Sequence, residues 1–206
     1  MALSEAGDPT PLSAAEAAIA GGDADARPRA LDLRAVVLVE GRSDRAALRA
    51  AAGVLGRDLE AEHVAVVAMN GVTNLIRCAQ AAAAIAPGVP LLALCDGAEE
   101  RWLRRALPRI PVPVRLERCD RDLEDELLRA LGTARALDVL AAEGELAAFR
   151  VLQGQPAQRL RPVEAQLHRF LGVASGRKAR LAGPLTAALA PHELPAPFAA
   201  VLAATG

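Results

Sequence analysis

Short, largely apolar segments recur along the first part of the chain, and a polar break follows each of the first three. These segments lie at 35–39, 64–68, 90–95 and 112–116. Short apolar runs without polar alternation are typical of strands that are buried on both faces of a parallel sheet. The pattern therefore predicts four strands packed between layers of helices.

Helical periodicity fills the intervals between these segments. It covers 44–55, 73–85 and 98–107, and Ser43 is the expected N-cap of the first helix. Strands that alternate with helices imply parallel pairing through right-handed crossovers. Beyond Asp122 only helical patterns follow. We therefore predict an α/β fold with a doubly wound, mainly parallel sheet and a helical C-terminal portion.

Three regions follow from these patterns. Residues 1–30 are rich in Ala, Gly, Asp and Pro without sustained periodicity, and are predicted to be a flexible leader with one short helix over 13–20. Residues 31–131 carry the strand–helix alternation and form the α/β domain. Residues 132–206 form a helical C-terminal extension that carries a basic segment.

Composition narrows the class of protein. Apolar residues make up 52% of the 206 residues, which excludes a mostly disordered chain. The formal net charge of −1 gives no global argument for a nucleic-acid partner. The charge is unevenly distributed, however, because between Leu146 and His192 the only acid is Glu164. The bases of that segment are Arg150, Arg159, Arg161, Arg169, Arg177, Lys178 and Arg180.

The cysteines and the apolar stretches point to the cytoplasm. Cys78, Cys95 and Cys119 are odd in number and widely spaced, which fits reduced, buried thiols better than a disulfide framework. The N-terminus lacks the basic start and apolar block of a signal peptide. The longest uncharged stretch is broken by Pro87, Gly88 and Pro90, so it is not a membrane span. We expect a cytoplasmic protein without a membrane partner.

Carboxylates follow two of the predicted strands. Glu40 ends the first strand and Asp96 the third, while Asp44 stands in the first turn of the next helix. Parallel strands present their carboxyl ends at one edge of a sheet, where ligands of open α/β sheets bind. Clustered carboxylate oxygens favour Mg²⁺ or Mn²⁺. From spacing alone, the alternative is that these acids cap helices and solvate a loop.

The segment Val36–Asp44, VVLVEGRSD, followed by Leu91–Asp96, LLALCD, resembles a Toprim domain. Within that superfamily it is similar to the overcoming-lysogenization-defect (OLD) nuclease group, which extends Glu-Gly to Glu-Gly-x-Ser-Asp. The stretch DLEDEL at Asp122–Leu127 is also typical of that group. The resemblance covers about Ala35 to Arg180.

The resemblance implies one or two divalent ions that cleave DNA. Glu40, Asp44 and Asp96 would hold the first ion, and Asp122 with Glu124 a second. The chain departs from the Toprim pattern Asp-x-Asp, because Asp96-Gly97 is followed by Ala98 and then by Glu99. Either Glu99 substitutes for the second Asp, or the second ion is weak or absent.

Lys178 is the only lysine in a chain with 24 basic residues, the other 23 being Arg. A position that keeps Lys in such a chain favours a compact ammonium, which can approach a phosphoryl oxygen singly. We expect Glu40 and Lys178 to be catalytic, and OLD-like nucleases carry a functional Lys in a comparable place. Arg177 and Arg180 are expected to contact the nucleic-acid backbone. His63, His168 and His192 are isolated in sequence and are not expected to bind metal.

Three functions remain open at this stage. The leading one is a metal-dependent DNA endonuclease or nickase. The alternatives are primase-like nucleotidyl transfer and a degenerate Toprim module that binds DNA or a partner protein. Topoisomerase chemistry is excluded within these 206 residues because they contain no Tyr. They also contain no G-x-x-x-x-G-K-[ST] loop, so any ATPase would be a separate partner, and homo-oligomers stay open.

Overall fold

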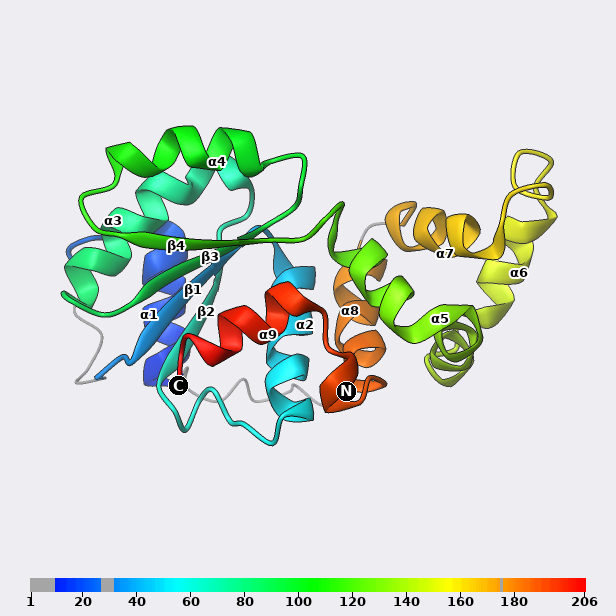
Figure 1. The fold of residues 1–206 in the computed structure, drawn as a ribbon, viewed down its shortest axis with the longest axis horizontal. Coiled ribbons are helices and arrows are strands. Elements are labelled where there is room, and N and C mark those ends of the chain that lie inside the picture. The colour runs from blue at the N-terminus through cyan, green and yellow to red at the C-terminus, as the bar shows by residue number, and fades with distance from the viewer. Residues whose placement is uncertain (1–9, 27–31, 175) are drawn as a thin grey trace, which may run out of the picture.

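A four-stranded parallel sheet forms the core of the left-hand part of the molecule in Figure 1. The computed structural model describes residues 10–26, 32–174 and 176–206. The strands are β1 (Ala35–Val39), β2 (Val64–Ala68), β3 (Leu91–Cys95) and β4 (Val114–Arg118), in the order β2-β1-β3-β4. The predicted α/β fold is confirmed. The fourth strand begins two residues later than predicted, after Pro113, which has no N–H to donate to the sheet.

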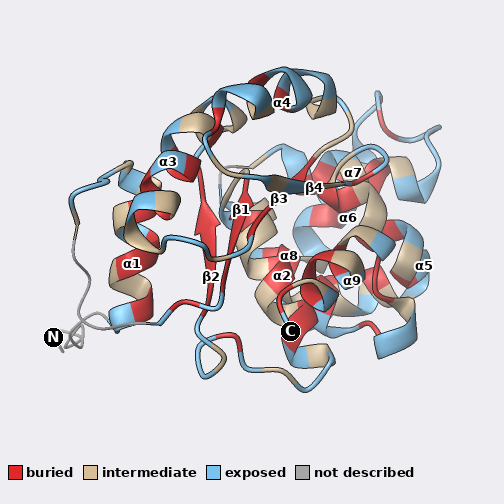
Figure 2. Cartoon of the chain, turned by 60° about the vertical axis from the view of Figure 1, so that its left-hand side comes forward, coloured by how far each residue is buried: buried red, intermediate tan, exposed pale blue. Residues whose placement is uncertain are grey.

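Helices cover both faces of the sheet. One face packs against α1 (Pro11–Gly21), α3 (Leu75–Ile85) and α4 (Glu100–Ala106), and the other against α2 (Arg42–Val54) and α9 (Ala196–Ala203). Successive strand residues enter opposite cores, so that Val37 packs with α2 whereas Val36 and Leu38 pack with α1 and α3. Strands β1, β2 and β3 are therefore buried along their whole length, as Figure 2 shows for these arrows.

The C-terminal residues are helical, as predicted, and they share the core of the sheet. The helices are α5 (Leu123–Ala142), α6 (Leu146–Gly154), α7 (Val163–Gly172) and α8 (Arg177–Ala187), with single 3₁₀ turns at Val72–Asn74, Leu107–Arg109 and Pro191–Glu193. Helix α8 packs along α2, and α9 returns to β3 and β4. Helix α5 runs across the boundary predicted at residue 131, interrupted at Gly132 with φ +71°.

The short helix predicted over 13–20 is present as α1 (Pro11–Gly21), and it packs against the sheet. Thr10 caps this helix, and Leu12, Ala15 and Ile19 are buried in the core of the sheet. The buried Glu16 accepts the Val66 N–H of edge strand β2 at 2.8 Å. Its oxygens also pair with Arg45 and Arg49 of α2, at 2.8 and 2.7 Å. The remainder of the predicted leader, 1–9 and 27–30, lies outside the described residues.

The prediction that Ser43 caps α2 is wrong. The N-cap is Gly41, and Ser43 is buried inside the first turn. Asp44 reaches back and accepts the Gly41 N–H with Oδ2 at 2.8 Å. The capping interaction therefore comes from a carboxylate three residues into the helix, which also favours the positive end of the helix dipole.

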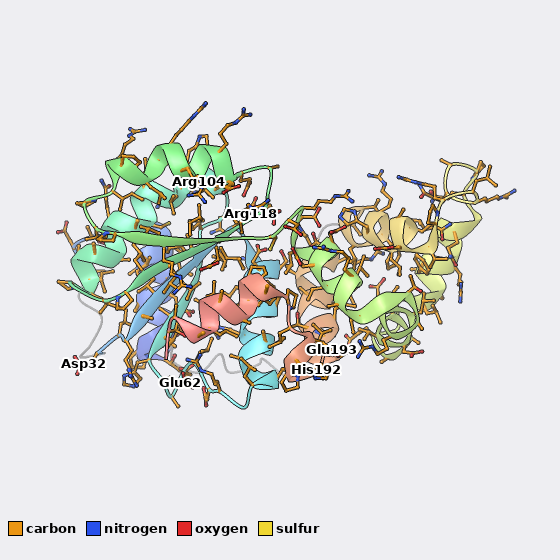
Figure 3. The ribbon with its side chains drawn as sticks, in the orientation of Figure 1. Asp32, Glu62, Arg104, Arg118, His192 and Glu193 are labelled. Carbon is orange, nitrogen blue, oxygen red and sulfur yellow. The ribbon has the colours of Figure 1, made fainter. Side chains whose placement is uncertain are left out.

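An ion-pair cluster fixes α4 over the end of β4. Arg104 and Arg118, both labelled in Figure 3, pair with Glu100 at 2.8 and 3.3 Å. The loop from Asp96 to Glu99, between β3 and α4, is consequently held at both ends. The three cysteines are buried and free, as expected. Among the described residues, no helix is both long and apolar enough to cross a membrane.

Glu16→Ala should lower the free energy of unfolding by about 2 kcal/mol. The Val66 N–H would lose its acceptor, although the partly exposed Arg45 and Arg49 can rehydrate, which keeps the loss below that of a fully buried pair. Urea unfolding measures the change, with Glu60→Ala, an exposed carboxylate, as control. Equal stability of the two variants would show that the contacts of Glu16 do not stabilise the fold.

Candidate metal and phosphate site

Glu40 and Asp96 emerge from adjacent strands at the carboxyl end of the sheet. Strands β1 and β3 are neighbours, with Val39 opposite Leu94, so the residues that follow them meet at one edge. The pKa of Asp96 is raised to about 7, mainly by burial and also by the negative charges of Asp44 and Glu40. The two strand ends that the sequence singled out therefore lie in one electrostatic cluster.

Asp44 joins this cluster from the first turn of α2. Burial raises its pKa to about 6, against the hydrogen bond from Gly41 and the positive charge of Lys178. The charges of Glu124 and Glu40 act in the same direction as burial. A group of carboxylates that resists ionisation in this way is deficient in positive charge.

Glu99, the residue after Ala98, lies beside Glu40. Burial raises the pKa of Glu99 to about 7, with further contributions from the charge of Glu40 and from a hydrogen bond with it. The sequence offered Glu99 only as a possible substitute in the altered Asp-x-Asp pattern. The structure brings it into the cluster, from the turn that precedes α4.

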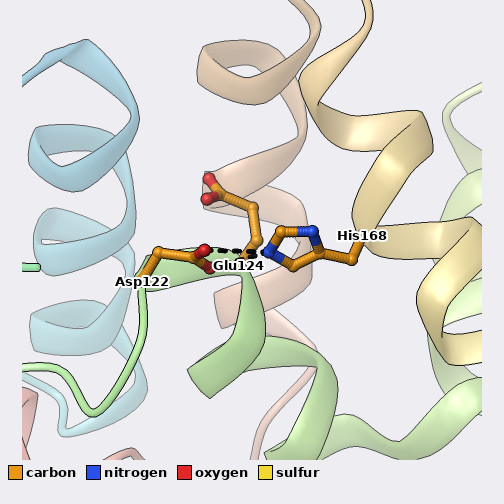
Figure 4. Close-up of side chains that lie close together, drawn as sticks. All are labelled: Asp122, Glu124 and His168. Carbon is orange, nitrogen blue, oxygen red and sulfur yellow. Dashed lines mark hydrogen bonds and ion pairs between the residues drawn. The ribbon is translucent and has the colours of Figure 1, made fainter. Parts of the chain in front are cut away.

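A second acidic group forms where α5 begins. Asp122, Glu124 and His168 offer ligand atoms that lie within 4.8 Å of one another (Figure 4). His168 Nε2 lies 2.9 Å from Oδ2 of Asp122, whose Oδ1 caps α5 through the Asp125 N–H. Burial works to raise the pKa of Asp122, but these two hydrogen bonds outweigh it, so the pKa is lowered.

His168 is the residue that the sequence analysis missed. It was expected to be isolated, yet it contacts Asp122 although 46 positions separate the two residues. The contact arises because α7 packs against α5. The only sequence signal was its place on α7 beside the buried residues Leu167 and Phe170, and that signal is weak.

Lys178 connects the two acidic groups. Its Nζ lies 2.8 Å from Oε2 of Glu124, which is 6% exposed. Burial works to lower the pKa of Lys178, but Glu124, Asp44 and Asp96 together raise it. The only lysine of the chain is thus held as an ammonium facing three carboxylates.

Arg177 and Arg180 are both paired within the protein. Arg177 Nε lies 3.1 Å from Oε2 of Glu145, its guanidinium carbon lies 3.9 Å from the Phe170 ring centroid, and Arg180 pairs with the same carboxylate. Arg177 is also mostly buried. These contacts anchor α8 to α7 and weigh against the expected role of both arginines in nucleic-acid contact, which stays a prediction.

The arrangement fits a divalent cation. Asp122, Glu124 and His168 are the group of described residues whose ligand atoms lie within 4.8 Å of one another. Glu40, Asp44 and Asp96 offer hard oxygen donors and interact through their charges, but they do not form such a close set among the described residues. Within the part of the chain that the structure describes, Glu99 Oε2 and Glu124 Oε1 are buried without a hydrogen-bond partner. Oxygens left unpaired in an acidic cluster are those that a cation would satisfy.

Known proteins share part of the sequence or the fold. Residues 33–97 match the family "Overcoming lysogenization defect protein-like, TOPRIM domain". The C-terminal region of the Burkholderia pseudomallei OLD protein has a similar fold, with a TM-score of 0.60, 19% identity, and coverage of 84% of this chain and 99% of that chain. For the C-terminal region of the Xanthomonas campestris OLD protein, the TM-score is also 0.60, the identity 21% and the coverage 84% and 94%. No curated protein matches the sequence.

Mn²⁺ should raise the melting temperature of the protein, and Asp96→Asn should abolish most of the rise. Selective binding to the folded state stabilises it by about 2.7 kcal/mol at about 100 times the Kd. Differential scanning fluorimetry measures the shift, with the exposed Glu143→Gln as control. A rise that is equal in Asp96→Asn and wild type would place the ion elsewhere.

Without metal, the protein should lose stability as the pH rises through the range of about 6 to 7. Asp44, Asp96 and Glu99 have raised pKa values, so the folded state binds more protons than the unfolded state and is favoured at lower pH. Thermal melts in EDTA between about pH 5 and 8 measure this fall, and Asp44→Asn should reduce it. A flat profile for wild type in EDTA would contradict the clustering of these carboxylates.

Proposed function

Because the chain carries an OLD-like Toprim domain over residues 33–97, we propose that it is a divalent-metal-dependent endonuclease or nickase, with DNA as its substrate. The observation that supports this function best is the cluster of Glu40, Asp44 and Asp96 at the carboxyl end of the sheet, with the ammonium of Lys178 facing Asp44 and Asp96. This edge is where ligands of open α/β sheets bind. Mg²⁺ or Mn²⁺ is the proposed cofactor, as one or two ions.

The residues of the two acidic groups and Lys178 would have different roles. Glu40, Asp44 and Asp96 would hold the first ion, and Asp122, Glu124 and His168 the second. When bound, a divalent ion supplies positive charge at a phosphoryl oxygen and at the water that attacks phosphorus. Lys178 would contribute an ammonium group, whose Nζ is oriented by Glu124. That charge would stabilise the negative charge that develops on the phosphate as the reaction proceeds.

The overall reaction is a hydrolysis. The oxygen of water bonds to phosphorus, the bond from phosphorus to one sugar oxygen breaks, and a proton from the water ends on that sugar oxygen. The scarcity of aromatic residues, 2% of the chain, indicates contacts with the phosphate backbone instead of stacked bases.

The departure from Asp-x-Asp is the main argument for a degenerate binding module. Glu99 weakens that argument, because its carboxyl group reaches Glu40 although Glu99 stands one position after the expected second Asp. The longer Glu side chain compensates for the later position. For this reason we favour catalysis over a binding module, and nothing specific to the site favours nucleotidyl transfer.

Wild-type protein should nick or linearise supercoiled plasmid in Mg²⁺ or Mn²⁺, and Glu40→Gln should reduce the rate to background. Lys178→Met, which keeps most of the side-chain volume, should cost about 100-fold or more, since it removes an electrostatic contact to the reacting phosphate. Agarose gels of the plasmid over time measure the rates.

Glu143→Gln is the matched control for the loss of a carboxylate, and Arg150→Gln for the loss of an exposed cation. Melting temperatures would establish that each variant is folded. Wild type that leaves plasmid, single-stranded DNA and RNA intact in both metals would support the binding-module alternative. Extension of a primed strand by added nucleotides would support nucleotidyl transfer.

A further inference from the structure

A basic cavity lies next to the acidic site, on the α7 side of α5. Its volume is about 360 Å³, and it is lined by Arg121, Arg161, Ala165, His168 and Arg169. Arg121 comes from the loop between β4 and α5, whereas the others come from α7 and the turn before it. The cavity therefore forms only when α7 packs against the start of α5.

The positive charge of this cavity is largely unneutralised. Among the described residues, no ion pair involves Arg161 or Arg169, and both side chains are exposed. Arg121 makes only long contacts with Asp122 and Asp125, at 3.5 and 3.8 Å, and is 63% exposed. In the same basic segment, Arg177 and Arg180 pair with Glu145, and Lys178 pairs with Glu124. Arg150 and Arg159 donate to uncharged oxygens of Gln153 and Gly154, and they line neither this cavity nor the smaller one beside it. Three guanidinium groups that share one concave surface are suited to an anion with several oxygens.

His168 joins this cavity to the acidic site. It lines the cavity, and its Nε2 lies 2.9 Å from Asp122 Oδ2 (Figure 4). An anion in the cavity is therefore separated from the second acidic group by a single side chain. Phosphates recur at short intervals along a nucleic-acid strand. A single strand can therefore place one phosphate in the cavity and a second phosphate at the acidic site.

The neighbouring surface limits where that phosphate can lie. A smaller cavity of about 190 Å³ shares Arg121, Ala165 and His168 with the basic one, but it is also lined by Asp125 and Glu164. These carboxylates disfavour an anion in the smaller cavity. Arg161 and Arg169 line only the larger cavity, so an anion is favoured there.

We infer that Arg121, Arg161 and Arg169 bind a backbone phosphate of the nucleic-acid strand, flanking the phosphate that is cleaved. The inference rests on the proposed function for its substrate class, and it assigns the strand a path over α7. No Phe, Tyr or Trp lines the cavity, and the imidazole of His168 is held by Asp122, so the contact is to phosphate and independent of base sequence. This cavity, instead of Arg177 and Arg180, then carries the nucleic-acid role of the basic segment.

The double variant Arg161→Gln/Arg169→Gln tests the inference. Fluorescence anisotropy with a labelled oligonucleotide, in Ca²⁺ and with its integrity checked on gels, measures affinity over a range of salt concentrations. We expect affinity to fall at least about tenfold at low salt. The slope of log affinity against log salt should become shallower by about 0.7 to 0.9 for each phosphate that the variant no longer neutralises.

The charge-matched control is Arg150→Gln/Arg109→Gln, which removes two exposed arginines that line neither cavity. An equal fall in affinity in both double variants would overturn the inference, since it would reflect net charge alone. An unchanged slope in Arg161→Gln/Arg169→Gln would overturn it as well. The inference would also be overturned if Arg161→Gln/Arg169→Gln lost its stabilisation by inorganic phosphate but bound the oligonucleotide as wild type does. The cavity would then bind free phosphate.

Plasmid cleavage separates this inference from the proposed function. If wild type binds the oligonucleotide with the expected arginine dependence but leaves plasmid intact, the cavity is supported and the nuclease is not. If wild type cleaves plasmid and Arg161→Gln/Arg169→Gln binds and cleaves equally well, the nuclease stands and the cavity is refuted. Both double variants should melt near the wild-type temperature, because the substituted side chains are exposed.

Discussion

Lys178 and Glu124 form a 2.8 Å ion pair that links α8 to the start of α5, and the geometry of the acidic site depends on it. Glu124 is almost completely buried, so its charge requires a partner inside the protein. The partner comes from α8, which itself lies along α2, the helix that carries Asp44. One contact therefore joins three helices around the end of the sheet. It also fixes the ammonium where Asp44 and Asp96 feel its charge.

A close backbone approach fixes the other side of the site. A Cβ at Gly97 would lie 2.2 Å from the Asp120 carbonyl oxygen, so no larger residue fits there without movement of the backbone. The Gly97 N–H donates to the Arg121 carbonyl at 3.0 Å, which joins the turn after β3 to the turn after β4. Asp96 and Asp122 belong to these two turns, and the charge of Asp122 contributes to the raised pKa of Asp96. Gly97 is therefore needed so that these two loops can pack closely against each other.

The sheet and the strand-end carboxylates could be predicted from sequence because their signals are local. Apolar runs give the strands, and the residue after a strand in a parallel sheet can only emerge at one edge. The contacts of α1 could not be predicted, since its attachment depends on Glu16 meeting an edge-strand N–H 50 positions away. His168 was missed for the same reason, because helix packing creates its contact with Asp122. Arg177 and Lys178 are adjacent in sequence, yet one faces Glu145 and the other Glu124, a division that charge counts cannot show.

His168 lies between a group of carboxylates and a group of arginines. The chain as a whole is nearly neutral, but its surface therefore has a negative region and a positive region side by side. Carboxylates gather at the end of the sheet, where burial and mutual repulsion raise the pKa values of Asp44 and Asp96. Arg121, Arg161 and Arg169 gather where α7 meets the start of α5. A nucleic-acid strand would be repelled by the first surface alone and attracted by the second. Divalent cations at the carboxylates would remove that repulsion, so cation and strand would each favour binding of the other.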